Sequence, residues 1–277
     1  MKLTVRHLPQ VALIAWTLFS VVPFVLIALS SLRNNFDLSE HPFGTGGAYR
    51  FSNYAEAWKG PFGSAGMATF LTNSVKAAVT ALFVNLTAGT SAAYFTTGLR
   101  PKWQMRAMQF FLLGTVIPFV LLLIPYFRAY QALNLLNSPV SAGVAYGVLG
   151  LPTTILILFA FFRDFPTELR EAAAIDGMGP ARTYLSVVLP LSKGAIVGAS
   201  LLMLIWVWNE TQLAIVLLQT APDQTVPVGV LGFQGSFTTD YGPLFAGLSI
   251  AVMPVLVIYL VFSRHVNKAV QLGGVSR

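Results

Sequence analysis

Six long apolar segments limit what this chain can fold into more than any other feature. Each is long enough, at about 20 residues or more, to cross the ~30 Å hydrocarbon core of a bilayer as an α-helix. The chain is 55% hydrophobic and 10% charged, whereas soluble domains are roughly a quarter charged. The sequence therefore predicts an all-α membrane protein with six transmembrane helices. The predicted spans are residues 8–32, 67–95, 107–127, 140–162, 194–218 and 243–263.

The lysines and arginines are distributed unevenly between the two sides of these spans. An even number of spans puts both termini on one side, and the loops of that side carry twelve basic residues against four on the other. Because positive charge is retained in the cytoplasm, we expect cytoplasmic N- and C-termini. The formal charge of +7 is then explained by topology, and nucleic acid is not an expected partner.

The first span begins like a secretory signal, with Lys2 and Arg6 before the apolar residues and a small-residue site at Ala28-Leu29-Ser30. Its 25 apolar residues exceed the core of about 7 to 15 in a signal peptide, so an uncleaved anchor is favoured over a cleaved signal. The absence of cysteine excludes disulfides and cysteine nucleophiles and leaves the compartment open.

The organisation predicted is a single membrane domain over residues 1–277. No internal repeat is visible, which argues against two halves of a transporter in one chain. Glycine-rich turns at Gly44–Gly47 and Gly60–Gly63 mark the outer loop of residues 33–66, where residues 53–58 are expected to form a short interfacial helix. A second outer loop, Gln219–Gly242, is rich in proline and glycine and is predicted to be exposed.

The inner loop of residues 163–193 is the most informative segment. Thr167 is a candidate N-cap for a short helix, and Gly177 is expected to end that helix in a left-handed conformation. A second helical piece is predicted after Gly179-Pro180, from Ala181 to Leu189, ending at Pro190. Phe165, Leu169, Ala173 and Asp176 lie near one stripe at helical spacing. A partner protein is predicted to bury the apolar ridge of this stripe, which has Arg170 and Glu171 at its rim.

Composition alone favours an amphipathic helix lying on the inner leaflet. The residues resemble something more specific: Glu171-Ala172-Ala173, Gly177 and Leu189-Pro190 match the spacing of the EAA loop in membrane subunits of bacterial ATP-binding-cassette (ABC) importers. Val187 stands where that family more often has isoleucine. The resemblance implies the type I importer permease fold and a bacterial cytoplasmic (inner) membrane location.

Further segments resemble the carbohydrate-importing branch, in particular the shorter of the two permeases of maltose-type importers. Trp208-Asn209-Glu210 is similar to its Trp-Asn-Glu-Phe motif, although Thr211 replaces the aromatic residue. Asn73-Ser74 and the tail Leu272-Gly273-Gly274-Val275 are weaker matches. The resemblance implies four kinds of partner: a second permease in a heterodimer, two ATP-binding subunits, an extracytoplasmic solute-binding protein, and a small carbohydrate.

In that family the EAA loop contains a coupling helix that sits in a groove of the ATPase subunit. The resemblance implies that Glu171 pairs with a basic group there, with a solvated surface charge as the alternative. Gly177 and Gly179 let the chain reverse. The residues expected to couple this chain to the ATPase are Glu168, Glu171, Ala172, Ala173, Asp176, Gly177, Leu189 and Pro190.

The chain itself is poorly equipped for chemistry or ion coupling. Of its ten acidic residues only Glu210 lies inside an apolar segment, whereas symporters need several intramembrane ionisable groups. No Gly-x-x-x-x-Gly-Lys-Ser/Thr motif occurs, and the three histidines are scattered. We therefore expect no enzyme activity, metal or cofactor on this chain, with ATP and Mg²⁺ bound by the partner ATPases.

The pathway for the solute is expected to involve Asn73, Asn85, Asn209 and Glu210. For Glu210 the alternative is a carboxylate satisfied by a neighbouring helix or by interfacial water. The function predicted is carbohydrate import as a permease subunit. The alternatives are an ABC importer of a non-sugar solute and, from another class, an ATP-independent channel or membrane scaffold.

Overall fold

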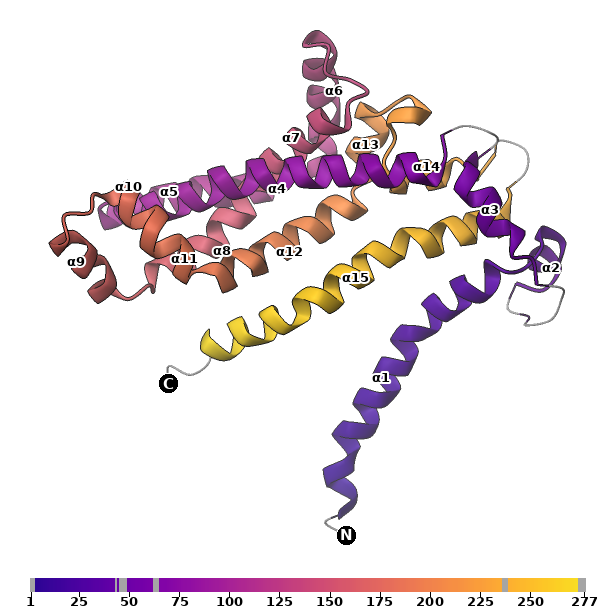
Figure 1. Ribbon diagram of the computed structural model, residues 1–277, viewed down its shortest axis with the longest axis horizontal. Coiled ribbons are helices and arrows are strands. Elements are labelled where there is room, and N and C mark those ends of the chain that lie inside the picture. Colours follow the sequence, from indigo (N-terminus) through magenta and orange to yellow (C-terminus); the bar gives the residue numbers. More distant parts are fainter. Residues whose placement is uncertain (1–2, 43, 45–48, 62–64, 236–238, 274–277) are drawn as a thin grey trace. The chain divides into compact units, whose positions relative to one another are not determined.

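The computed structural model describes residues 3–42, 44, 49–61, 65–235 and 239–273, which are mostly helical (Figure 1). That part of the chain contains no strand, only an isolated antiparallel bridge between Gln234 and Thr239. The chain divides into two compact units, Met1–Leu71 with Val226–Pro254, and Thr72–Thr225 with Val255–Arg277. Each unit is described by itself below.

Within the described residues, three helices are long and apolar enough to cross a membrane. They are α1 (Leu3–Ser30), α4 (Met67–Thr97) and α15 (Tyr241–Gly273), and their apolar parts are Gln10–Ser30, Met67–Thr97 and Tyr241–Leu260. These ranges agree within a few residues with three of the six predicted spans. The tail residues Gly274 and Val275, and most of the two glycine-rich turns of the outer loop, lie outside the described residues.

The other three predicted spans are not single straight helices. In residues 107–127, α5 (Pro101–Val116) turns by 87° into η2 (Phe119–Leu122) and α6 (Leu123–Ala132). The cause is Pro118, which has no N–H to continue the helical ladder and holds Ile117 in an extended conformation. Residues 140–162 bend by 48° at Gly150, between α7 (Pro139–Leu149) and α8 (Leu151–Arg163).

The fifth predicted span, residues 194–218, also ends early as a helix. α12 (Lys193–Asn209) stops at Glu210, and α13 (Gln212–Leu217) starts after the break. At its other end α12 is bent by 78° from the segment Pro180–Leu191. Counting each bent pair as one span gives up to six spans, so the number six stays a prediction.

The first unit contains α2 (Asn35–Glu40), α3 (Ser52–Lys59) and α14 (Val226–Leu231) besides α1 and parts of α4 and α15. The helix predicted at residues 53–58 is present as α3. The prediction that Gln219–Gly242 is an exposed loop is wrong for α14 and the residues just after it, because Val226, Val230 and Phe233 are at most 3% exposed and belong to the same core cluster as Phe70. The prolines and glycines of this segment indicated a turn-rich loop, so the apolar pattern of its valines was not recognised in the sequence.

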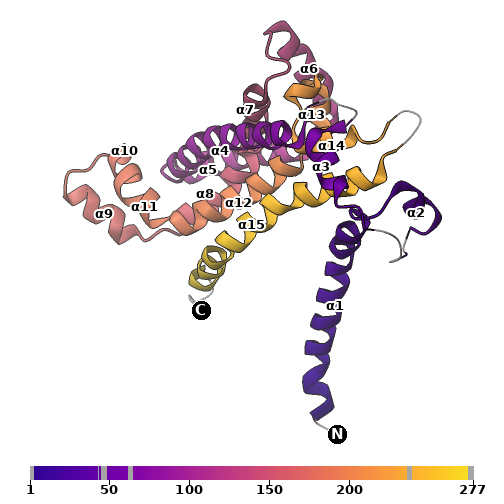
Figure 2. The ribbon, with the colours of Figure 1, turned by 45° about the vertical axis from the view of Figure 1, so that its right-hand side comes forward.

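The second unit contains the inner loop and the broken helices. Its core joins α4, α8 and α12 to the inner loop through Tyr94, Leu158, Phe162, Tyr184 and Val188. The inner loop forms α9 (Thr167–Ile175), α10 (Pro180–Thr183), the π-helical η3 (Tyr184–Val188) and α11 (Leu189–Leu191). In Figures 1 and 2 these elements lie at one end of α12, and α13 lies at the other.

Candidate functional site

The first helix of the inner loop has the predicted C-terminus but a different N-terminus. Thr167 is the first residue of α9, and Pro166 occupies the cap position without a side-chain hydrogen bond. The Thr167 cap prediction is therefore wrong. At the other end Gly177 has φ +74°, and the N–H groups of Gly177 and Met178 donate to the carbonyls of Ala174 and Ala173 at 3.0 and 2.9 Å. This is a Schellman motif, which satisfies the last carbonyls of α9.

One face of α9 is open to solvent. Glu168, Glu171, Ala172 and Ile175 follow each other at helical spacing, all are exposed, and Ile175 is 87% exposed. Asp176, which caps the helix, is also exposed. Two carboxylates beside a small residue and a protruding apolar side chain form a surface that a basic, apolar groove would complement. We call these four residues the open face of α9.

Two of the four residues in the stripe predicted to face a partner are buried within the chain, whereas Leu169 is 41% exposed and Asp176 is exposed. Phe165 is 7% and Ala173 4% exposed, and Phe165 belongs to the core that also holds Phe162. That prediction is therefore wrong for these two side chains, because the loop folds back and covers them. The side chain of Arg170 also points back toward the chain: its Nη2 donates to the carbonyls of Phe162 and Phe165 at 2.7 and 3.1 Å. The guanidinium thus caps the C-terminal end of α8.

The second helical piece continues further than predicted. Pro190 does not end it, since α11 includes Leu189, Pro190 and Leu191. The N–H of Leu189 donates to the carbonyl of Tyr184, five residues back. We attribute the tolerance of Pro190 to this wider π turn, which relieves the clash of the proline ring with the preceding turn. Leu189 is half-buried and Pro190 is exposed.

A contact that sequence analysis missed attaches this piece to α4. The hydroxyl groups of Tyr184 and Thr90 are 2.6 Å apart. The ring of Tyr184 stacks on Tyr94 with centroids 5.1 Å apart and an angle of 28°. The available signal was Tyr184 itself, the one tyrosine in the sequence of residues 163–193, but its partner is 94 positions away.

Asn85 is buried within the second unit. It is 0% exposed. Its Nδ2 donates to the carbonyl of Gly147 at 3.0 Å, and its Oδ1 accepts from Thr154 Oγ1 at 2.7 Å. These contacts lie on either side of the break at Gly150. Asn85 therefore ties both halves of the bent α7–α8 pair to α4.

The other two candidate asparagines differ in exposure. Asn73 is 4% exposed and donates from Nδ2 to the carbonyls of Pro222 and Gln224 at 2.8 and 3.1 Å. Asn209 is exposed and donates only to the carbonyl of Ile205, in its own helix, at 2.8 Å. Asn73 thus holds a loop, and Asn209 presents its amide oxygen to the surroundings.

Glu210 is buried, at 8% exposure, and its carboxylate bridges a helix break. Oε1 accepts from the N–H of Leu213 at 2.8 Å and Oε2 from the N–H of Ala214 at 3.0 Å. Both donors lie in the first turn of α13, where free N–H groups favour a negative charge. The neighbouring helix, through its backbone, is what satisfies this carboxylate.

The predicted site residues do not form a single cluster. α9 to α11 precede α12, and Glu210 follows it, so the two groups are separated by a helix of 17 residues, about 25 Å long at ~1.5 Å per residue. Among the described residues no group of three or more histidines and carboxylates lies close enough to hold a metal ion.

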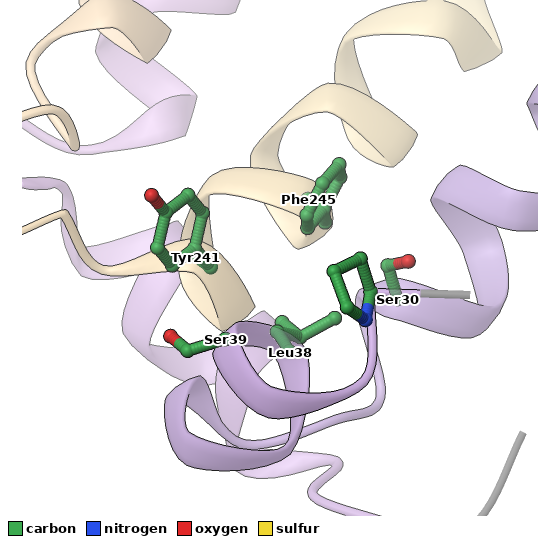
Figure 3. Close-up of a pocket in the computed structure, with 6 residues that line it drawn as sticks. Ser30, Leu38, Ser39, Tyr241 and Phe245 are labelled. Carbon is green, nitrogen blue, oxygen red and sulfur yellow. The ribbon is translucent and has the colours of Figure 1, made fainter. Parts of the chain in front are cut away.

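A cavity of about 380 Å³ in the first unit had no counterpart in the sequence analysis. Figure 3 shows Tyr241 and Phe245 of α15 beside Leu38 and Ser39 of α2, with Ser30 at the end of α1. Arg33 holds α2 in place by donating to the carbonyls of Asp37 and His41, each at 2.8 Å.

Comparisons with known proteins identify relatives over most of the chain. The profile of a family described as "Binding-protein-dependent transport system inner membrane component" matches residues 85–272. The diacetylchitobiose uptake system permease protein NgcG of Streptomyces coelicolor is 30% identical, over 94% of this chain and 86% of that protein. The trehalose transport system permease protein SugB of Mycobacterium tuberculosis is 30% identical, over 81% of each chain.

A solved structure shares the fold. A chain of a bacterial ABC transporter involved in the import of the acidic polysaccharide alginate superposes with a TM-score of 0.76, covering 94% of this chain and 96% of that chain at 19% identity.

Proposed function

Because the chain belongs to the family of binding-protein-dependent transport system inner membrane components, we propose that it is the permease subunit of an ATP-driven importer of a carbohydrate. The observation that carries the solute class is the set of relatives. Two of them are permeases for diacetylchitobiose and trehalose, and the structural relative belongs to an importer of a polysaccharide. The solute is a sugar, an oligosaccharide or a polyol.

The chain works as half of a membrane heterodimer with a second permease. ATP and Mg²⁺ bind to two partner ATPase subunits, and an extracytoplasmic binding protein delivers the solute. Six spans place both termini in the cytoplasm. The three long apolar helices and the three bent pairs support this topology, as does the excess of basic residues in the loops on the side of the termini.

The open face of α9 is the contact with the ATPase subunit. Glu168 and Glu171 meet basic groups there, Ala172 permits close approach, and Ile175 inserts into an apolar pocket. Asp176 and Gly177 fix the end of the helix, while Ala173, Leu189 and Pro190 position it from behind. A rigid element is needed for this task, because a flexible loop would absorb the movement of the ATPase.

The solute pathway uses Asn209 and Glu210 at the end of α12. The exposed amide of Asn209 is available to a ligand, and Glu210 holds the turn that presents it. Asn73 and Asn85 act by position: their amides are engaged with backbone or threonine, so they shape the pathway rather than touch the solute.

The test of this function is uptake by the reconstituted complex. The chain is co-purified with its ATPase and reconstituted with the second permease, and uptake of labelled diacetylchitobiose and trehalose is measured with ATP and the binding protein. ATP-dependent uptake of either sugar is expected. Uptake of a non-sugar solute alone would identify a different importer, and flux without ATP or without a co-purifying ATPase would identify a channel.

The location of the open face is tested separately with a cysteine, since the chain has none of its own. Ile175→Cys is expected to react with a membrane-impermeant thiol reagent in inside-out vesicles only, and to cross-link to the ATPase subunit. Phe36→Cys, in α2 and 73% exposed, is the matched control and is expected to react from the opposite side. Labelling of both from the same side would refute the topology.

A further inference from the structure

The second unit contains a cavity of about 370 Å³ where two of the helix breaks meet α12. Gly114 and Thr115 line it from the end of α5, Gly150 and Thr153 from the break between α7 and α8, and Trp206 from α12. The two broken helices approach closely here. A Cβ on Gly114 would come within 2.9 Å of Cγ of Pro152. None of the residues predicted to form the pathway lines this cavity.

The backbone around the cavity is unsuited to lipid. Gly114 and Thr115 belong to the last turn of α5, whose carbonyls have no helical N–H donors. Such carbonyls are tolerated at membrane depth only where they are buried in protein or line a water-filled space. Two interrupted apolar segments meeting at one point are also the arrangement in which transporters place their ligands.

The side chains supply both kinds of surface that a sugar ring needs. Trp206 is 39% exposed and is held edge-to-face by Phe119 and Tyr146, with ring centroids 6.3 and 6.1 Å away. An indole fixed by such contacts presents a rigid apolar surface. The hydroxyl of Thr153 is exposed and has no hydrogen bond to any residue in the described part of the chain. That of Thr154 is donated to Asn85.

We propose that this cavity is a carbohydrate subsite, in which the C–H face of a pyranose ring packs on Trp206 and ring hydroxyls bond to Thr153 and to the free carbonyls at the end of α5. The proposal rests on the proposed function and adds the residues that touch the solute. A volume of about 370 Å³ is at the lower end of small-molecule sites and fits one sugar unit at a time.

The first test asks whether the cavity contains water and admits sugar. Thr153→Cys and the control Ile205→Cys are placed in the assembled complex and treated with a negatively charged methanethiosulfonate. Ile205 is 42% exposed on the same helix as Trp206 but does not line the cavity. Thr153→Cys is expected to react at least about tenfold faster, and a mixture of diacetylchitobiose and trehalose is expected to slow only that reaction. Equal rates, or no slowing by sugar, would overturn the subsite.

The second test asks whether the aromatic face is what binds. Trp206→Leu keeps apolar bulk and loses the indole, and it is expected to raise the KM for sugar uptake by about tenfold. Trp206→Phe keeps an aromatic face and should change KM by no more than about threefold. An unchanged KM in Trp206→Leu would refute the stacking role while the wild-type uptake still upheld the importer. If the wild-type complex took up no sugar, the proposed function would be refuted, and the subsite, which depends on that function, would be refuted with it.

Discussion

The hydroxyl groups of Tyr184 and Thr90 lie 2.6 Å apart although 94 residues separate them in sequence. The contact connects the second half of the inner loop to α4, one of the long apolar helices of the described part. A buried hydrogen bond and a stacked pair of tyrosines therefore join the loop to α4 directly.

Removing this hydrogen bond is expected to weaken both stability and coupling. Tyr184→Phe and Thr90→Val should each lower the free energy of unfolding by about 1 kcal/mol. Since they remove the same bond, the double variant should show an interaction energy of about 0.5–1.5 kcal/mol. Unfolding in detergent and sugar transported per ATP hydrolysed are the measurements. Strictly additive effects would mean that the two hydroxyls do not interact.

Gly177→Val is expected to uncouple ATP hydrolysis from transport while the protein still inserts. A Cβ at Gly177 meets nothing within 4 Å, so the effect comes from φ +74° alone, which costs a branched residue more than about 1 kcal/mol. Gly179→Val is the matched control, because Gly179 also has open surroundings but lies at φ −72°. Uptake and ATPase activity are measured together. Normal uptake by Gly177→Val would contradict the prediction.

Replacing Glu210 is expected to loosen the junction of α12 and α13. Glu210→Ala removes both acceptors from the N–H groups of Leu213 and Ala214, and losing such a cap costs about 0.5–2 kcal/mol. Glu210→Gln retains one acceptor and should cost less. Glu56→Gln is the control, because the partly exposed carboxylate of Glu56 makes only a long ion pair with Arg50, at 3.9 Å. Loss of that ion pair should change the free energy of unfolding by less than about 1 kcal/mol. The thermal midpoints of the three purified variants decide the order, and an equal effect at Glu56 and Glu210 would argue against a capping role.

Gly229→Ala is expected to destabilise the first unit. A Cβ at this position would overlap ring atoms of Phe70, so either the ring or one of the helices α4 and α14 must shift, at about 1–3 kcal/mol. Gly198→Ala in α12 meets nothing within 4 Å and should be neutral or slightly stabilising. Folded yield and the midpoint of unfolding are compared. Wild-type behaviour of Gly229→Ala would show that Phe70 moves aside without cost.

Local chemistry made part of this structure predictable from sequence. The left-handed end of α9 follows from a glycine after a helical segment, and the apolar parts of α1, α4 and α15 follow from length and hydropathy. The bounds of the inner loop follow from the apolar stretches on either side of it, since α8 ends at Arg163 and α12 begins at Lys193. Its contact with an ATPase stays a prediction.

Contacts between distant residues were not predictable. Nothing near Asn85 indicates that it bonds to Gly147 and Thr154 across a bend, and hydropathy cannot distinguish a straight span from one broken at Pro118. The burial of Val226 and Val230 was missed because turn-forming residues surround them. The cavity beside Trp206 arises only when three separate segments meet.

The segments Pro180–Leu191 and Lys193–Asn209 meet at a bend of 78°. They form the short and the long arm of an angled lever, with Ser192 at the pivot. Ser192 is 0% exposed, so the pivot is enclosed by protein. In a rigid pair of arms, a force applied across the short arm turns both arms about the pivot. Such a force swings the far end of α12, where Asn209 and Glu210 lie, sideways instead of pushing the helix along its axis. A small displacement of the short arm is thereby enlarged at the far end of α12 in proportion to the lengths of the two arms.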